Sequence, residues 1–165
     1  AGDATVGFEI LQQKPSVETI IVPASGAGLL AGIALSVHIT SPSISVVGVQ
    51  PEANGTLRKS LDLGERTTRS KIETVADGLT AARPGRYGFK VTQDLVDDVL
   101  TVSESALLEA TKLMFHEEGV IVEPAGAAGL AALLEGALPN NEGVTTLVVT
   151  GGNVDPKIWS EWVSR

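Results

Sequence analysis

Residues 19–29 read TIIVPASGAGL, a short β-branched run that leads directly into a glycine-rich turn. The run at 19–22 has the composition of a buried strand, and the small apolar residues at 29–39 predict a helix after the turn. Glycines let several backbone N–H groups point into one concavity, and the start of a helix adds a positive partial charge. Ser25-Gly26-Ala27-Gly28 therefore predicts a phosphate-type anion site, although a tight turn without a ligand is equally compatible with it.

Strand and helix patterns alternate on both sides of this turn. Further buried strands are expected at 45–49, 96–102 and 145–149. Helices are expected at 5–14, after Ser103, from Pro124 and from Pro156. The charged stretch 51–92 is expected to be an irregular surface region with a loop at 84–86. The pattern predicts one α/β domain over residues 1–165, with three layers and a mostly parallel sheet of about four strands.

Composition excludes several classes of function. The net charge of −8 argues against nucleic acid and against an anionic membrane surface, and no apolar run is long enough to span a bilayer. The chain has no cysteine, so it has no disulfide and no thiolate site. We expect a cytoplasmic protein. The chain starts at Ala1 without methionine and soon enters a helical pattern, so we expect a piece of a larger protein or one that has lost its start.

A second turn follows the last predicted strand, at Thr150-Gly151-Gly152-Asn153. Ligands of parallel sheets bind at the carboxyl ends of the strands, which is where both turns are expected. A threonine hydroxyl at that place can hydrogen-bond a ring nitrogen while the glycines leave room for the ring. An ordinary turn without a ligand also explains the pattern.

A dinucleotide site is the competing interpretation of the first turn. Residues 26–31 match the fingerprint G-x-G-x-x-A. That fold requires an acid at the end of the next strand, to hold the ribose hydroxyls. The next strand ends at Gln50, and Glu52 lies beyond a proline. A nucleotide-binding, Rossmann-like domain is therefore the weaker alternative.

Several segments, taken together, resemble the fold-type II pyridoxal phosphate enzymes of the threonine dehydratase and serine racemase group. Residues 1–10 are similar to the family's A-G-Q-G-T-x-G-x-E-I, and residues 22–29 to its tetraglycine phosphate loop. Residues 47–51, 76–79, 122–127 and 150–155 match as well, so the resemblance covers essentially the whole chain.

The resemblance implies a cofactor, pyridoxal 5′-phosphate, and a role for each of eight residues. The phosphate would be held by Ser25, Gly26, Ala27, Gly28 and Leu29. Thr150 would hydrogen-bond the pyridine nitrogen, and Gly78 and Glu123 would lie near the cofactor and its ring. The implied substrate class is a small hydroxy amino acid, and the family is usually dimeric.

The chain departs from the family pattern at four places. The family's Schiff-base lysine lies before the phosphate loop, where this chain has only Lys14 without the motif, and the family's small domain is missing. We therefore predict no catalytic residue and no efficient dehydratase or racemase activity for the chain alone; a non-catalytic binding or interaction module is the alternative. Ser25 and Ala27 replace glycines, and alanine is unfavourable if that position needs positive φ. Gln50 and Thr56 stand where some family members bind a divalent cation through an acid, which predicts no metal site.

Overall fold

The computed structural model describes residues 2–138 and 143–164, and its centre is a sheet of four parallel strands. In chain order these are β1 (Val17–Pro23), β2 (Ser45–Pro51), β3 (Asp98–Val102) and β4 (Val144–Leu147). Their order across the sheet is β3-β2-β1-β4, with every neighbouring pair parallel. The prediction of a parallel sheet of about four strands is confirmed.

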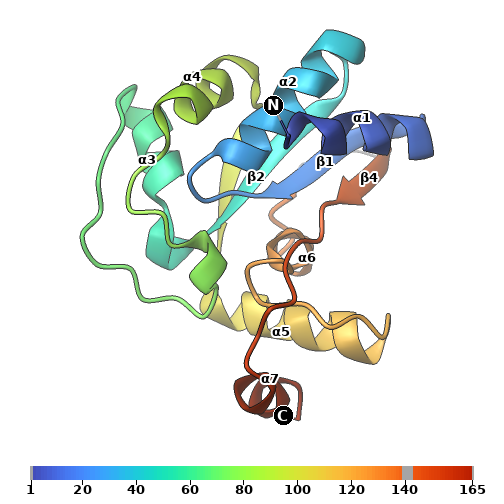
Figure 1. Cartoon of the computed structure of the whole chain (residues 1–165), viewed down its shortest axis with the longest axis vertical. Helices are drawn as coiled ribbons and strands as arrows, with labels where there is room; N and C mark the ends of the chain where they lie inside the picture. Colours follow the sequence, from blue (N-terminus) through green and yellow to red (C-terminus); the bar gives the residue numbers. More distant parts are fainter. Residues whose placement is uncertain (1, 139–142, 165) are drawn as a thin grey trace.

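Helices cover both faces of this sheet (Figure 1). On one face lie α1 (Ala4–Gln13), α2 (Gly28–Thr40) and α4 (Arg86–Leu95); on the other lie α5 (Glu104–His116) and α6 (Ala128–Leu134). The alternation of side chains along β1 shows the division, because Ile20 packs with the α2 side chains and Ile21 packs with α5 and α6. The predicted three-layer α/β/α arrangement is therefore correct.

The C-terminal helix α7 (Pro156–Val163) lies outside these layers, against α5. Trp159 packs edge-on against Phe115 of α5, with ring centroids 4.6 Å apart. The His116 ring nitrogen Nε2 hydrogen-bonds with the Val163 carbonyl at 2.9 Å. Pro156 occupies the first turn of α7 as predicted.

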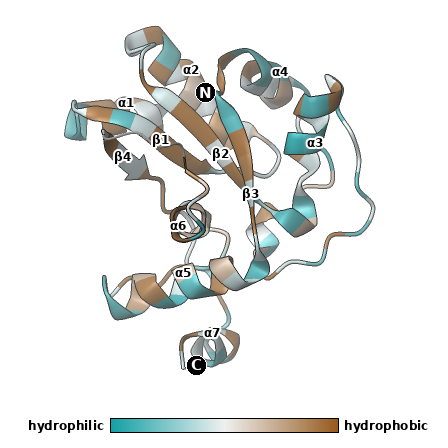
Figure 2. Cartoon of the chain, turned by 180° about the vertical axis from the view of Figure 1, so that it is seen from behind, coloured by the Kyte–Doolittle hydropathy of each residue, from teal (hydrophilic) through white to brown (hydrophobic). Residues whose placement is uncertain are grey.

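Apolar residues are concentrated in the sheet and on the helix faces that cover it. Figure 2 shows β2 in brown at the centre, while α3 at the edge carries much of the teal. The α6 helix is built from alanine, glycine and leucine, and it packs closely on β1 and β4 through Gly129, near Ile21 and Leu147. Among the described residues, no helix combines the length and the hydropathy needed to cross a bilayer.

The structure corrects three parts of the sequence interpretation. The stretch 51–92 is not simply irregular, because it contains α3 (Thr56–Leu63), α4 and two 3₁₀ turns, η1 (Glu52–Asn54) and η2 (Asp77–Leu79). The loop predicted at 84–86 extends one residue too far, because Arg86 already begins α4. Pro124 does not begin a helix: residues 124–127 form turns, and α6 begins at Ala128. The other predicted elements agree with the observed ones to within a few residues.

Candidate functional site

A cavity of about 230 Å³ lies at the carboxyl ends of β1 and β4. From β1 the chain continues to β2 and β3 on one side of β1, and β4 then pairs with β1 on its other side. The direction in which the sheet is built therefore reverses at β1, and we call this topological switch point the winding reversal. Ligands of open parallel sheets bind at such a point. The lining includes all eight residues that the sequence singled out: Ser25, Gly26, Ala27, Gly28, Leu29, Gly78, Glu123 and Thr150.

The glycine turn forms one wall of the cavity and leads into α2. The first N–H groups of a helix have no acceptor within the helix, so those at the start of α2 are available to a ligand. Gly26 and Gly28 leave this wall open. A Cβ atom on Gly26 would meet only Ala81 Cβ at 3.6 Å, and one on Gly28 would meet only Asp3 Oδ2 at 3.5 Å.

Ala27 has a left-handed backbone conformation, with φ of 70°. This is the positive φ that the sequence analysis named as unfavourable for an alanine in place of glycine. Among the described residues Ala27 is the only non-glycine with positive φ, a conformation that costs an L-residue roughly 1–2 kcal/mol. Its side chain is buried against Gly88 of α4. A Cβ atom on Gly88 would lie 2.9 Å from the Ala27 carbonyl oxygen and 3.1 Å from Ala27 Cβ, so Gly88 leaves the space that Ala27 needs.

Residues 78–85, which we call the strap, hold the glycine turn from outside. The Ala81 N–H donates to Ser25 Oγ at 2.9 Å, and the Gly85 N–H donates to the Gly26 carbonyl at the same distance. Because Ser25 Oγ accepts from Ala81, its own hydroxyl proton remains to be donated elsewhere. Sequence reasoning missed the strap, apart from Gly78, and also missed Gly88. A glycine within a helical stretch was the available signal for Gly88.

Glu123 and Thr150 form the opposite wall. The Glu123 N–H donates to the Gly151 carbonyl at 3.0 Å, which ties the turn before α6 to the turn after β4. A Cβ atom on Gly78 would lie 3.1 Å from Glu123 Oε1, and one on Gly151 would collide with the same carboxylate. Glu123 is half-buried between these glycines and Thr150 is exposed. The cavity therefore presents hydroxyl, carboxylate and backbone amide groups.

Asp3 is an acidic residue beside the glycine turn, and its carboxylate faces Gly28. We expect Asp3→Asn to raise the affinity for inorganic phosphate, since it removes a negative charge near the start of α2. Interactions between exposed charges are about 0.2–1 kcal/mol, which corresponds to a gain of at most about fivefold. Isothermal titration at low and high salt measures this gain, which should shrink as salt screens the charge. An unchanged affinity at low salt contradicts the prediction, and Glu9→Gln on the exposed surface of α1 is the control.

Comparison with known proteins agrees with this geometry. Residues 1–151 match the family model described as pyridoxal-phosphate dependent enzyme. The L-threonine ammonia-lyase of Geobacter sulfurreducens is 38% identical over 165 residues, which cover 100% of this chain and 41% of that protein. The serine racemase of Arabidopsis thaliana is 36% identical over 170 residues, covering 99% of this chain and 51% of that protein.

A solved structure gives the same result for the fold. The structure of maize serine racemase superimposes with a TM-score of 0.90 at 38% identity, covering 99% of this chain and 51% of that one. The chain thus spans about half the length of the curated relatives it matches. These matches favour the pyridoxal phosphate interpretation over the dinucleotide one. The chain belongs to the fold-type II family of pyridoxal-phosphate dependent enzymes, in which it is homologous to threonine dehydratases and serine racemases.

Proposed function

We propose that the cavity between the glycine turn and Thr150 binds pyridoxal 5′-phosphate. The observation that carries this proposal is that four segments far apart in the sequence bring all eight implied residues to one cavity at the winding reversal. The residues present fit the group. Gly26 and Gly28 leave space for an anion at the start of α2, and polar side chains stand on the opposite wall, where a ring would lie.

The phosphate would be held without a cationic side chain. No lysine or arginine is among the described residues that line the cavity. The N–H groups at the start of α2 and the Ser25 hydroxyl would therefore provide the hydrogen bonds, supported by the helix dipole. Ser25 through Leu29 would form this part of the site.

The ring would lie toward Glu123, Gly78 and Thr150. Bound pyridoxal phosphate supplies an electron sink for reactions at an amino acid's α-carbon. The Thr150 hydroxyl is neutral, so as a partner of the ring nitrogen it would not force protonation of the ring. This moderates electron withdrawal and suits loss of a β-hydroxyl group. Glu123 would orient the ring from the turn before α6.

We further propose that the chain is the cofactor-phosphate-binding portion of a threonine or serine dehydratase-like lyase. Its own lysines do not reach the cavity: Lys14, Lys59, Lys71, Lys90 and Lys157 are exposed, and Lys112 lies 3.4 Å from Glu109 on α5. Activity on a hydroxy amino acid would then need a segment that supplies the lysine. The chain alone would be inactive.

Titration with pyridoxal 5′-phosphate, followed by borohydride reduction and mass spectrometry, tests both proposals. We expect reversible binding that inorganic phosphate competes for, and no borohydride-stable adduct on any lysine. We also expect keto-acid release from L-threonine or L-serine no faster than with free cofactor. Absence of binding contradicts the cofactor site. A stable adduct together with turnover contradicts the proposed inactivity.

A non-catalytic anion-binding module is the second candidate, and the absence of a lysine from the described cavity lining favours it. The two candidates differ in selectivity. A cofactor site should bind pyridoxal 5′-phosphate more tightly than inorganic phosphate, because Glu123 and Thr150 would contact the ring. A simple anion module should bind both with the same affinity, and Thr150→Val should then have no effect on either ligand.

A further inference from the structure

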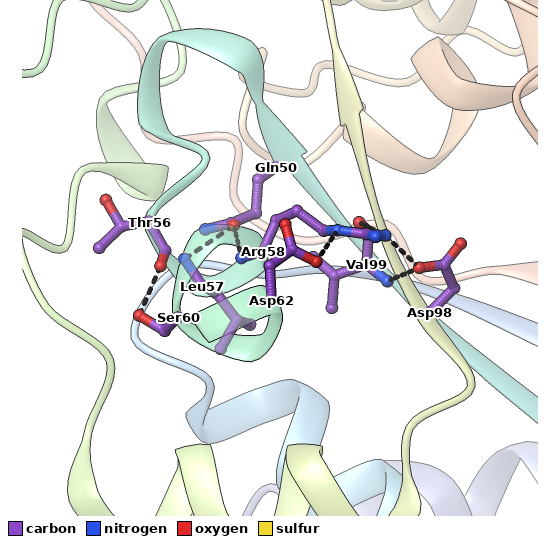
Figure 3. A network of polar contacts seen from close by, with 8 residues as sticks. All are labelled: Gln50, Thr56, Leu57, Arg58, Ser60, Asp62, Asp98 and Val99. Atoms are coloured by element: carbon purple, nitrogen blue, oxygen red, sulfur yellow. Dashed lines mark hydrogen bonds and ion pairs between the residues drawn. The ribbon is translucent and has the colours of Figure 1, made fainter. Parts of the chain in front are cut away.

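A polar network lies where β2 leads through η1 into α3 (Figure 3). Gln50 is fully buried, and its Oε1 accepts hydrogen bonds from the Leu57 and Arg58 N–H groups, both at 3.1 Å. These are first-turn amides of α3, so the Gln50 side chain serves as the cap of that helix from a distance of several residues. Because Oε1 accepts from two backbone donors, the orientation of the amide is fixed, and Nε2 is left buried without a partner among the described residues.

Three more buried side chains, those of Asn54, Thr56 and Ser60, continue this network. The Thr56 hydroxyl donates to Asn54 Oδ1 at 2.5 Å, and both residues are almost completely buried. The Ser60 hydroxyl donates to the Thr56 carbonyl at 2.7 Å and accepts from the Thr67 N–H at 2.9 Å. The side chains that form this buried core of the network are neutral.

The site where some family members hold a divalent cation does not fit one here. Hard cations take several oxygen ligands, of which carboxylates supply the charge. Gln50 and Thr56 stand at the places where those members bind the cation through an acid, and the oxygens of Gln50 and Asn54 already accept hydrogen bonds. The buried Nε2 group is an N–H donor, which repels a cation rather than binding it.

The same network reaches the cavity through the strap. Asn54 Nδ2 donates to the Leu79 carbonyl at 2.5 Å and is 3.4 Å from the Ala81 carbonyl. The Ala81 N–H in turn donates to Ser25 Oγ in the glycine turn. One buried amide side chain thus links the end of β2 to the wall of the proposed phosphate site.

We propose that Gln50, Asn54 and Thr56 form a latch that does not depend on a cation and that holds the strap against the glycine turn. Gln50 fixes the start of α3, Thr56 orients Asn54, and Asn54 positions Leu79 and Ala81. Only the expected effect of the latch on phosphate affinity rests on the proposed function. Its independence of cations and its hold on the strap are properties of the fold alone.

Thermal melting with and without divalent cations tests the first property. The melting temperature of the protein should be the same in excess EDTA, Mg²⁺ or Ca²⁺. Gln50→Glu places a carboxylate in the buried position and should lower the melting temperature in EDTA by about 4 °C or more, with partial recovery in Ca²⁺. Gln12→Glu, an exposed change of the same charge, should have no such effect.

A cation-dependent shift of the unmodified protein would overturn the proposal. Equal melting temperatures for Gln50→Glu and Gln12→Glu in EDTA would overturn it as well. If Gln50→Glu does not fold, the unmodified protein decides the question of cations by itself, and the hold on the strap is decided by a second pair of variants.

Hydrogen exchange of the Ala81 amide tests the hold on the strap without any ligand. Asn54→Ala removes the donor to Leu79 and should accelerate that exchange by about twofold to tenfold, the range for loss of one hydrogen bond. Thr111→Ala removes a buried hydroxyl that donates to the Leu107 carbonyl within α5, and it should lower the melting temperature and leave Ala81 exchange unchanged. Equal Ala81 exchange in the two variants overturns the latch. Phosphate titration of the same pair adds a separate result. If the protein binds no phosphate, the proposed function is contradicted, and the latch is not.

Discussion

Gly126→Ala is expected to lower the melting temperature of the protein by about 2–12 °C, from an overpacking cost of about 1–3 kcal/mol. Gly126 is buried in the turn between Glu123 and α6. A Cβ atom there would lie 2.7 Å from the Thr150 carbonyl oxygen, 2.7 Å from Val122 Cγ2 and 2.9 Å from the Gly151 carbonyl oxygen. Two of these atoms belong to the backbone, so the turn after β4 must move. Melting followed by circular dichroism measures the loss.

Gly129→Ala is the matched control for this change. Gly129 is also buried and lies three residues further along, but a Cβ atom there would meet Ile21 and Leu147 at 3.5 Å or more. These are ordinary contact distances, and alanine is favoured over glycine in a helix by up to about 1 kcal/mol. Its melting temperature should be no lower than that of the unmodified protein. Equal losses in the two variants would show that backbone crowding at Gly126 is not the cause.

Gly26→Asp is expected to weaken binding of inorganic phosphate and of pyridoxal 5′-phosphate by at least about tenfold, or about 1.4 kcal/mol. The new carboxylate would stand in the cavity wall, where it repels the ligand's phosphate and competes for the N–H groups at the start of α2. The fold should tolerate the change, since a Cβ atom on Gly26 meets only Ala81 Cβ at 3.6 Å.

Gly26→Asn separates the charge from the volume in this experiment. The two side chains have nearly the same size, so a purely steric effect would weaken binding equally in both variants. The proposed anion site predicts weaker binding by the aspartate variant, with a difference that shrinks as salt is added. Similar affinities in the two variants at low salt would contradict the assignment of the phosphate to this wall.

The parts of the site that the sequence predicts are those with a local pattern. The glycine turn directly follows a β-branched run, and Thr150 follows another, so the rule for parallel sheets places both at one edge. The strap has no such pattern. Its contribution comes from the Ala81 and Gly85 amides, which bond to residues far away in the chain. Backbone groups of this kind have no sequence signature.

The errors in the fold have a similar cause. In α4, Phe89 and Thr92 are buried and Leu95 packs on the same core, but the preceding Pro84-Gly85 and the internal Gly88 are residues typical of loops, and they hide the helical pattern. Proline is common in the first turn of a helix, but tertiary contacts override that preference at Pro124. The turns at 124–127 bring Glu123 to Gly151 before α6 can begin.

The contact between Ala27 and Gly88 couples what the two positions tolerate. With any side chain at position 88, the left-handed turn at 27 would be crowded as well as strained. Replacing Ala27 by glycine would relieve the strain and remove one of the atoms that a side chain at 88 would meet. The carbonyl oxygen of residue 27 would still lie 2.9 Å from a Cβ atom at 88, so position 88 requires glycine with either residue at 27.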